Sequence, residues 1–360
     1  MLVGVPKEIK THEYRVGLTP EAVREYVAAG HRVIVETRAG EGISKGDDIY
    51  RAAGAEVVGT AAEVFARAEM VVKVKEPQPN EWVQLREGQI LYTYLHLAPD
   101  PDQARGLMAS GVSAVAYETV TAPDGSLPLL APMSEVAGRL SIEAAGTALR
   151  AFNGGRGVLL GGVPGVLPAK VVVLGGGVVG TQAARMAAGL GANVEIFDRS
   201  LPRLRALDEM FHGRVTTRFS TMATIEQAIT DADVVIGAVL IPGAAAPHLV
   251  TRSMLGLMKP RAVLVDVAID QGGCFETSHP TTHADPTYEV DGIIHYCVAN
   301  MPGAVPLTSS YALNNATLPF GLALANKGIA ACEQDPHLAP GLNVHKGRIV
   351  NAAVAESLGF

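Results

Sequence analysis

The chain has 360 residues, of which 48% are hydrophobic and 18% are charged, with 39 glycines and 22 prolines. At about 150 residues per domain this length predicts two domains, and the composition excludes general disorder. The net charge is −7, and the basic residues form no long run. Because a phosphate backbone needs a basic surface, we expect no nucleic-acid partner.

Signals for membrane insertion and export are missing from the sequence. The longest apolar stretches, residues 171–180 and 234–247, are shorter than the about 18 residues that a membrane span needs. The first residues lack the basic head, apolar middle and cleavage site of a secretory signal. Cys274, Cys297 and Cys332 form no CxxC pair and no even-numbered framework of the kind that disulfides need, which suits a reducing compartment. We therefore expect a cytoplasmic protein that does not cross a membrane.

The first third of the chain alternates short apolar runs with helix signals, which is the pattern of parallel strands joined by crossover helices. Thr19 and Asp100 each precede a proline and predict helix N-termini, and Gly30 predicts the end of the first helix. Thr60 and Glu63 have the spacing of a capping box. The expected strands are residues 2–5, 32–35, 55–58, 70–74, 90–95 and 112–116.

A second alternating series follows an Ala-rich segment, residues 134–152, that predicts one long helix. The strands expected in this series are residues 171–174, 194–197, 234–238, 262–265 and 295–298. A further stretch, residues 311–327, is interrupted only by Pro319 and predicts the return of the chain to the first domain.

The predicted fold class is therefore α/β, with two domains that each contain a mostly parallel sheet flanked by helices. One domain is discontinuous and consists of residues 1–130 and 307–360. The other, residues 131–306, is inserted into it.

The inserted domain begins with a glycine motif. Gly175, Gly177 and Gly180 form GxGxxG between an apolar strand and an Ala-rich helix. In such a motif the first glycine permits a tight turn, the second lets a pyrophosphate approach the backbone, and the third lets helix and strand pack closely. Asp198 follows Gly175 by 23 residues, near the distance at which a carboxylate binds the adenosine ribose. The inserted domain is thus predicted to be a Rossmann-type domain, and the alternative is a Gly-rich turn beside a solvated aspartate.

The residues at the end of the second strand of the inserted domain, residues 194–197, bear on the choice of coenzyme. Asp198 favours NAD over NADP, because a fixed carboxylate accepts hydrogen bonds from ribose hydroxyls and repels a 2′-phosphate. Arg199 leaves the alternative open, since a guanidinium at that point could bind the phosphate. We expect NAD.

Four polar side chains lie at or just after predicted strand ends. These residues are Arg15, Lys75, His96 and Asp270. Ligands of open parallel sheets bind at the carboxyl ends of the strands, so side chains at such positions in two domains can meet in one cleft. Taken alone, a polar residue just after a strand is more often a solvated loop residue than a functional one.

Seven segments of the chain resemble the alanine dehydrogenase family. Several of these motifs also occur in the NAD-binding subunit of proton-pumping nicotinamide nucleotide transhydrogenase, which has the same fold. The segments are VGVPKEIKTHEYRVGLTP at the start, VVKVKEP at 71–77, YLHLA at 94–98, PMSEVAGRLS at 132–141, LGGGVVG at 174–180, VDVAIDQGG at 265–273 and VANMPGAVPLTSSYAL at 298–313.

The resemblance implies NAD-dependent, reversible oxidative deamination of L-alanine to pyruvate and ammonia by a homohexamer. It implies that Arg15 and Lys75 bind the substrate carboxylate and carbonyl oxygen, and that His96 and Asp270 form the acid–base pair. The residues that it places around the NAD are Met133, Ser134, Gly175, Gly177, Val178, Val179, Gly180, Asp198, Arg203, Ser220, Val239, Leu240, Val267, Val298, Asn300 and Met301.

Two other functions remain as alternatives. The first is the NAD-binding subunit of a proton-translocating transhydrogenase, which passes hydride between nucleotides beside a membrane partner. The second is a non-catalytic NAD sensor, which the fold alone never excludes.

No metal site is expected. Some members of the family that the sequence resembles bind magnesium through an acid and a histidine on the helix after the nucleotide-binding domain. This chain has Ala323 and Lys327 at those positions. His279 and His283 are four residues apart, a spacing that suits a metal only on a helix. Pro280 disfavours a helix there, so we expect both histidines in a loop.

Overall fold

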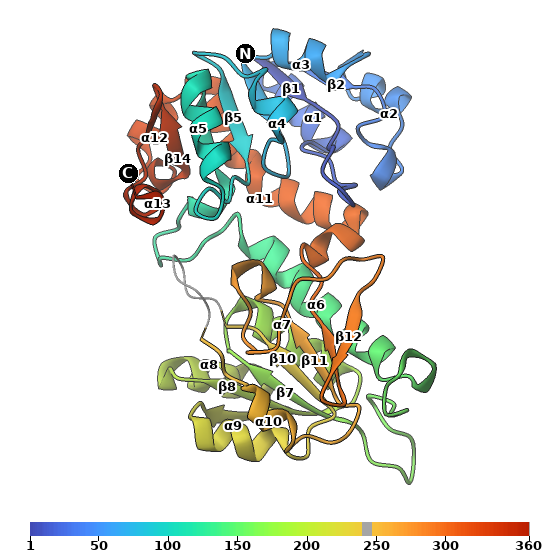
Figure 1. The fold of residues 1–360 in the computed structure, drawn as a ribbon. Helices are drawn as coiled ribbons and strands as arrows, with labels where there is room; N and C mark the ends of the chain where they lie inside the picture. Colours follow the sequence, from blue (N-terminus) through green and yellow to red (C-terminus); the bar gives the residue numbers. More distant parts are fainter. Residues whose placement is uncertain (240–246, 360) are drawn as a thin grey trace. The chain divides into compact units, whose positions relative to one another are not determined.

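The computed structural model describes residues 1–239 and 247–359. The chain forms two compact units. Unit 1 consists of Met1–Met133 and Val305–Phe360, and unit 2 of Ser134–Ala304 (Figure 1). Within the described residues, no helix is long and apolar enough to cross a membrane.

Unit 1 contains an eight-stranded sheet in the order β15-β14-β6-β5-β4-β1-β2-β3. Its first six strands along the chain pair in parallel, whereas β14 and β15 form an antiparallel edge. The strands are β1 (Leu2–Val5), β2 (Arg32–Glu36), β3 (Glu56–Val58), β4 (Met70–Val72), β5 (Ile90–Thr93), β6 (Ser113–Ala116), β14 (Leu342–His345) and β15 (Arg348–Ile349).

Three of the unit 1 helices begin at the caps that the sequence predicts. The Thr19, Thr60 and Asp100 side chains each accept a hydrogen bond from a backbone N–H of the first turn that follows. The helices are α1 (Pro20–Ala28), α2 (Asp47–Ala52), α3 (Ala61–Arg67), α4 (Pro79–Trp82), α5 (Pro101–Ser110), α11 (Pro306–Lys327), α12 (Ala330–Gln334) and α13 (Ala352–Leu358), with 3-10 turns at Glu41–Ile43, Tyr117–Thr119 and Ala339–Gly341.

Unit 2 contains a seven-stranded sheet in the order β12-β13-β11-β10-β7-β8-β9, in which β12 is the antiparallel strand. Its strands are β7 (Lys170–Leu174), β8 (Asn193–Asp198), β9 (Thr216–Phe219), β10 (Val234–Gly237), β11 (Val263–Asp266), β12 (Thr287–Val290) and β13 (Ile293–Tyr296). Its helices are α7 (Val178–Gly189), α8 (Leu201–Phe211), α9 (Met222–Ile229) and α10 (Arg252–Leu255), with 3-10 turns at Ala151–Asn153, Ile269–Gln271 and Met301–Ala304; α6 (Ala131–Ala148) begins in unit 1 and continues into unit 2.

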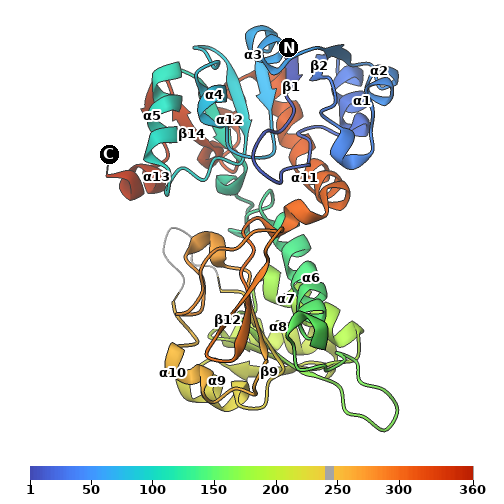
Figure 2. The same ribbon diagram turned by 45° about the vertical axis from the view of Figure 1, so that its right-hand side comes forward.

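The central strand β7 shows how both faces of the unit 2 sheet are buried. Val171 and Val173 pack in one hydrophobic cluster, with side chains of α6, α7 and α8. Val172 and Leu174 pack in the other, with side chains of α9 and α10. Successive side chains of a strand point to opposite faces, so a run of apolar residues is needed where helices cover both faces (Figure 2). This matches the expected α/β architecture.

Several predicted boundaries are wrong by a few residues. The helix α6 begins at Ala131, before the expected 134, because Pro132 is tolerated in a first helical turn, and it ends at Ala148. The strand expected at 295–298 is β13, which begins at Ile293 directly after Gly292, a residue with φ of +81°. The stretch 311–327, which was expected to return the chain to the first domain, lies in the helix α11, and this helix continues through Pro319.

Four strands were not predicted: β9, β12, β14 and β15. The first of these, β9, has mostly half-exposed side chains and includes Arg218, so it lacks an apolar run. The strands β12, β14 and β15 pair antiparallel at sheet edges, where one face need not be apolar.

Candidate active site

The loops after β1, β4 and β5 carry the polar residues that were singled out in the first half of the sequence. These strands are neighbours in the sheet and run parallel, so their carboxyl ends lie at one edge. Arg15 and Lys75 are 2% and 9% exposed, whereas His96 is exposed. The structure of unit 1 therefore brings these three loops together at one edge of its sheet.

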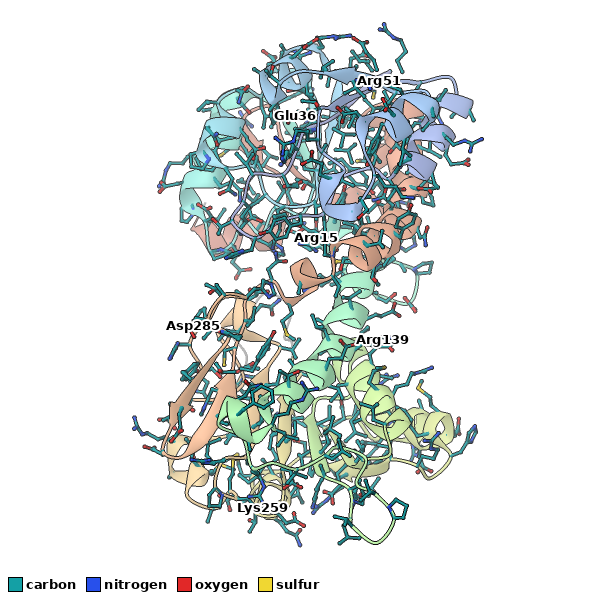
Figure 3. All side chains as sticks on the ribbon, turned by 90° about the vertical axis from the view of Figure 1, so that its right-hand side faces the viewer. Arg15, Glu36, Arg51, Arg139, Lys259 and Asp285 are labelled. Atoms are coloured by element: carbon teal, nitrogen blue, oxygen red, sulfur yellow. The ribbon has the colours of Figure 1, made fainter. Side chains whose placement is uncertain are left out.

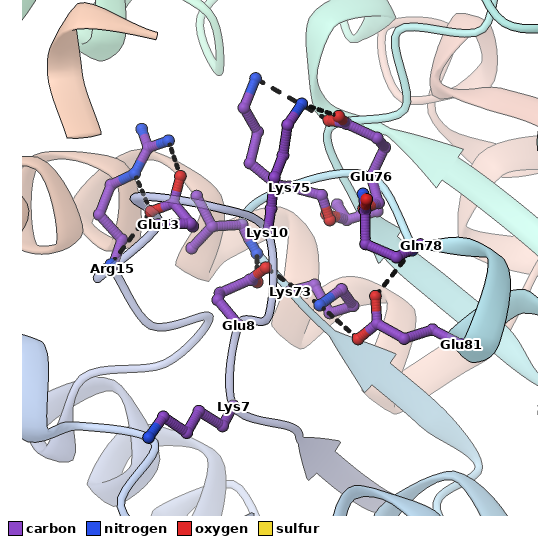
Figure 4. Close-up of polar contacts among 12 residues, drawn as sticks. Lys7, Glu8, Lys10, Glu13, Arg15, Lys73, Lys75, Glu76, Gln78 and Glu81 are labelled. Carbon is purple, nitrogen blue, oxygen red and sulfur yellow. Dashed lines mark hydrogen bonds and ion pairs between the residues drawn. The ribbon is translucent and has the colours of Figure 1, made fainter. Parts of the chain in front are cut away.

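Arg15 forms a buried ion pair with Glu13 (Figure 4). Its Nε and Nη2 atoms donate to the two carboxylate oxygens at 2.7 and 2.6 Å, and its Nη1 lies 3.1 Å from the Met133 sulfur. Burial opposes the charged guanidinium, but Glu13 outweighs it and raises the pKa of Arg15 above its ordinary value. Glu13 thus takes one edge of the guanidinium fork and fixes its plane.

Lys75 and Lys10 both lie against Glu76 (Figure 4). The Lys75 Nζ is 3.8 Å from a Glu76 carboxylate oxygen, and Lys10 forms a closer ion pair with the same side chain. Burial alone would raise the pKa of Glu76, but the two ammonium groups outweigh burial and lower it. This edge of the sheet therefore holds two lysines against one ionised carboxylate.

Lys73, two residues before Lys75, is fully buried. Its Nζ donates to Glu8 at 3.0 Å and to Glu81 at 2.9 Å (Figure 4). Burial would lower the pKa of this ammonium, but the two carboxylates outweigh burial and raise it. Glu8 also accepts from the Val74 backbone N–H at 2.7 Å. The cluster ties the loop after β1 to the segment that carries Lys75.

His96 sits in a left-handed backbone conformation, with φ of +48°. The Glu118 carboxylate accepts from the backbone N–H groups of His96 at 2.6 Å and of Leu95 at 3.2 Å. The Tyr94 ring stacks on the imidazole with 5.6 Å between centroids and 9° between planes. A non-glycine residue in this region needs support from its surroundings, and Glu118 and Tyr94 supply it.

The glycine turn of unit 2 has the geometry that a dinucleotide phosphate requires. Gly175 has φ of +108°, and a Cβ at Gly180 would lie 1.8 Å from the Gly175 carbonyl oxygen. A Cβ at Gly177 would meet nothing within 4 Å, so the space before the N-terminus of α7 is open. The turn lies between β8 and β10, where the strand order of the sheet reverses. These residues fit the pyrophosphate of NAD.

Asp198 and Arg203 shape this turn from the neighbouring strand and helix. The Asp198 carboxylate accepts from the backbone N–H groups of Gly176 and Ser200, each at 2.8 Å. Arg203 donates to the Gly176 carbonyl at 2.6 Å and to the Thr181 hydroxyl at 2.7 Å. Both side chains therefore hold the backbone around the glycine motif.

The other residues predicted to surround the NAD lie in unit 2 along the carboxyl ends of the strands or on α6 and α7. Val178 is exposed, and Ser134, Val179, Ser220, Val239, Val267 and Asn300 are half-buried. Val298 and Met301 are 0% and 3% exposed and pack in the hydrophobic core, so their side chains have little surface for a ligand. Met133 belongs to unit 1, against Arg15, and Leu240 lies outside the described residues.

Asp270 is exposed on the 3-10 turn Ile269–Gln271, which follows β11. Its carboxylate accepts from the backbone N–H of Asn300 at 3.4 Å. Asp270 and Asn300 are thus brought together within unit 2. The pairing of Asp270 with His96, a residue of unit 1, stays a prediction.

Among residues 1–239 and 247–359, no group of three or more His, Cys, Asp or Glu side chains is arranged to hold a metal ion. His279 stacks on Tyr288, and His283 lies 3.2 Å from the Asn300 carbonyl oxygen. Lys327, on α11, donates to Gln334.

Sequence reasoning missed the side chains that hold the site residues in place. Glu13 and Glu76 lie in loops and Glu118 lies on the 3-10 turn Tyr117–Thr119, and their sequence surroundings do not distinguish them from solvated residues. Lys73 and Asp266 had a usable signal, because each is a charged residue within or at the end of an apolar run. A charge in such a position is buried and needs partners.

Comparisons with known proteins identify the family of this chain. The family model described as alanine dehydrogenase/PNT, N-terminal domain, matches residues 4–137, and the corresponding C-terminal domain model matches residues 141–352. The alanine dehydrogenase of Halomonas elongata is 59% identical over 100% of this chain and 97% of its own length. A solved L-alanine dehydrogenase structure has a TM-score of 0.97 and 55% identity, covering 100% of this chain and 99% of that one.

A more distant structure belongs to the same group. The transhydrogenase from Sinorhizobium meliloti has a TM-score of 0.83 and 27% identity, over 98% of this chain and 100% of that chain. The family models together span both compact units, and the relatives match over the full length. The chain therefore belongs to the alanine dehydrogenase/PNT family.

Proposed function

We propose that this protein catalyses the NAD-dependent, reversible oxidative deamination of L-alanine to pyruvate and ammonia. The observation that carries the proposal is the gathering of Arg15, Lys75 and His96 at the ends of adjacent parallel strands, in a chain 59% identical to an alanine dehydrogenase. In this proposal unit 1 is the substrate domain and unit 2 is the NAD-binding domain.

Arg15 and Lys75 bind the substrate. The planar guanidinium fork of Arg15, whose plane Glu13 fixes, matches the two oxygens of the substrate carboxylate. Lys75 is a compact positive charge that stabilises negative charge on the carbonyl oxygen of pyruvate or on the corresponding hydroxyl. Glu76 holds this ammonium near its own carboxylate until a substrate oxygen takes its place.

His96 and Asp270 move the protons. Oxidation of the alanine Cα gives an imine, which adds water and then expels ammonia. Histidine exchanges protons near neutral pH and can pass one between the water, the hydroxyl group and the leaving amine. Asp270 orients the attacking water or holds the ammonium group. Glu118 keeps the His96 backbone in the conformation that presents its ring.

Unit 2 holds NAD through the open backbone at Gly177, the N-terminus of α7 and the Asp198 carboxylate. When bound, its nicotinamide accepts the hydride from the substrate Cα. The residues further predicted to contact NAD are Met133, Ser134, Val178, Val179, Arg203, Ser220, Val239, Leu240, Val267, Val298, Asn300 and Met301.

We also propose a homohexamer, as the resemblance to the family implies, and a place in the cytoplasm, which the cysteine pattern favours. Light scattering coupled to gel filtration measures the subunit number directly. A mass of one or two chains at working concentration would contradict the hexamer.

The activity is tested by mixing the protein with NADH and pyruvate, with and without ammonium chloride, and following the absorbance of NADH. Loss of NADH only with ammonium, and formation of alanine, is expected. Loss of NADH without ammonium, with lactate as the product, would contradict the proposal. A transhydrogenase subunit would leave pyruvate unchanged, and a sensor would bind NADH without turnover.

A further inference from the structure

Asp266 is a fully buried carboxylate at the carboxyl end of β11. Its Oδ2 accepts from the Ser278 hydroxyl at 2.6 Å and from the backbone N–H groups of Cys274 and Phe275 at 2.7 and 3.2 Å. Its Oδ1 accepts from the Ala268 backbone N–H at 3.1 Å. All four donors belong to the one loop that follows the strand.

This loop carries Asp270. The residues from 268 to 278 leave the strand, form the 3-10 turn with Asp270, and come back to Asp266 at Cys274. Gly273 passes so close that a Cβ there would lie 2.7 Å from the Asp266 Oδ2. The returning segment is fixed a second time, because the Leu249 N–H donates to the Cys274 carbonyl at 2.7 Å. Asp270 itself is exposed.

An ionised carboxylate matches these four donors better than a neutral side chain does. A carboxylate only accepts hydrogen bonds and has about four lone-pair positions, which matches four converging donors. An asparagine of the same shape would keep one acceptor and bring an NH₂ group against N–H and O–H donors. Burial raises the pKa of Asp266, and the hydrogen bonds from Ser278, Cys274, Phe275 and Ala268 oppose that shift.

We infer that Asp266 is a positioning residue, which fixes the loop so that Asp270 is presented to the substrate in one geometry. This inference rests on the proposed function, since it assumes that Asp270 takes part in the reaction. A shift of a reacting group by about 1 Å can cost about 100-fold in rate. Asp266 is buried beneath the loop, so its effect on turnover passes through Asp270.

The test compares Asp266→Asn, Asp270→Asn and the double variant in the full-length protein. Asp266→Asn is expected to lower kcat by about 10- to 100-fold, with the KM for NAD and the dissociation constant of NADH, measured by its fluorescence, close to wild type. If Asp266 acts through Asp270, the double variant has the same kcat as Asp270→Asn alone, because the group to be positioned is already lost.

Asp233→Asn is the matched control. Asp233 is a buried aspartate of the same sheet, at the amino end of β10, where it accepts from the Lys170 N–H at 2.9 Å. Asp233 forms an ion pair with Lys259. Figure 3 shows Lys259 at one end of unit 2 and Asp285, on the loop before β12, at the opposite end. Asp233→Asn is expected to lower thermal stability but to keep the wild-type kcat.

Three results overturn the inference: a folded Asp266→Asn protein with wild-type kcat, a double variant whose loss is the product of the single losses, or an equal loss of kcat in Asp233→Asn. Wild-type kcat in Asp270→Asn overturns the role of Asp270 and the inference together. The alanine, pyruvate and ammonium assay on the wild type then still decides the proposed reaction.

A milder variant covers the case in which Asp266→Asn does not fold. Ser278→Ala removes one of the four donors and leaves the charge in place. A several-fold fall in kcat is expected, and this fall should vanish in the Asp270→Asn background. An unchanged kcat in Ser278→Ala, or a fall that persists without Asp270, overturns the inference.

Discussion

The carboxyl ends of the two sheets are built on different physical plans. In unit 1 the edge carries charged side chains, and other charged side chains hold them in place: Glu13 pairs with Arg15, and Glu76 pairs with both Lys10 and Lys75. In unit 2 the edge presents backbone, and carboxylates hold that backbone: Asp198 accepts from Gly176, and Asp266 accepts from the loop after β11.

The difference follows from the sizes of the two ligands in the proposed reaction. A small carboxylate substrate offers few atoms, so a site must supply concentrated, fixed charge to bind it. A dinucleotide offers a long surface, and its pyrophosphate is bound by N–H groups that only an open glycine backbone exposes. Breaking charge should therefore damage unit 1 most, and adding bulk should damage unit 2 most.

The largest expected effect on stability is in unit 1. Lys73→Met leaves Glu8 and Glu81 buried without their ammonium partner, which should lower the free energy of unfolding by about 3–5 kcal/mol. Urea unfolding measures this loss. Lys10→Met is the control, because Lys10 is 37% exposed, and its pair with Glu76 is expected to contribute less than about 1 kcal/mol. Equal losses in the two variants would show that burial of the charge does not matter.

Two glycine-to-alanine variants test whether unit 2 is close-packed at Gly180 and open at Gly177. Gly180→Ala forces a Cβ against the Gly175 carbonyl and should cost about 1–3 kcal/mol of stability. Gly177→Ala meets open space and has an ordinary φ, so its stability should stay near wild type. We expect Gly177→Ala to weaken NADH binding by about tenfold, since the methyl occupies the phosphate path. Unchanged NADH affinity in Gly177→Ala would place the pyrophosphate elsewhere.

The choice of coenzyme should depend on Asp198. Wild type is expected to prefer NAD, and Asp198→Ala should narrow the NAD to NADP ratio of kcat/KM by about tenfold, because it removes repulsion of the 2′-phosphate. Asp208→Ala, an exposed charge on α8, serves as the control and should leave the ratio unchanged. Equal use of NADP by the wild type would mean that Arg199 decides the coenzyme.

The smallest effect is a pH dependence of stability from His295. Its ring is buried between the Thr277 hydroxyl and the Ile293 carbonyl, and burial lowers the pKa of this imidazole below its ordinary value of 6.5. On acidification the unfolded chain takes up the proton first, so stability is full above pH 6.5 and falls as the pH drops toward the folded-state pKa. Urea unfolding between pH 5 and 8 measures this slope.

His295→Gln should flatten that slope. His248→Gln, at an exposed histidine, is the control and should retain the wild-type slope. A wild-type slope in His295→Gln would assign the pH dependence to other groups.

Local patterns along the chain were enough to predict the strands of both sheet cores and several helix starts. The buried strands of both sheets are continuous apolar runs, and the helix starts at Thr19, Thr60 and Asp100 follow from capping chemistry that acts within one turn. The glycine motif was equally readable, because each glycine answers a constraint set by its near neighbours. The pairing of β14 was not predictable, since this strand finds its partner β6 more than 200 residues away.

The contacts that hold the site residues could not be predicted in this way, because they form between distant parts of the folded chain. Arg15 was identified from its place after a strand, but its guanidinium is oriented by Glu13 and touches Met133, which lies far along the chain. The Lys73 cluster joins a loop, a strand end and a short helix, and no local pattern specifies that combination. Buried charges take the partners that folding brings near them, and that choice depends on the packing of whole units rather than on sequence spacing.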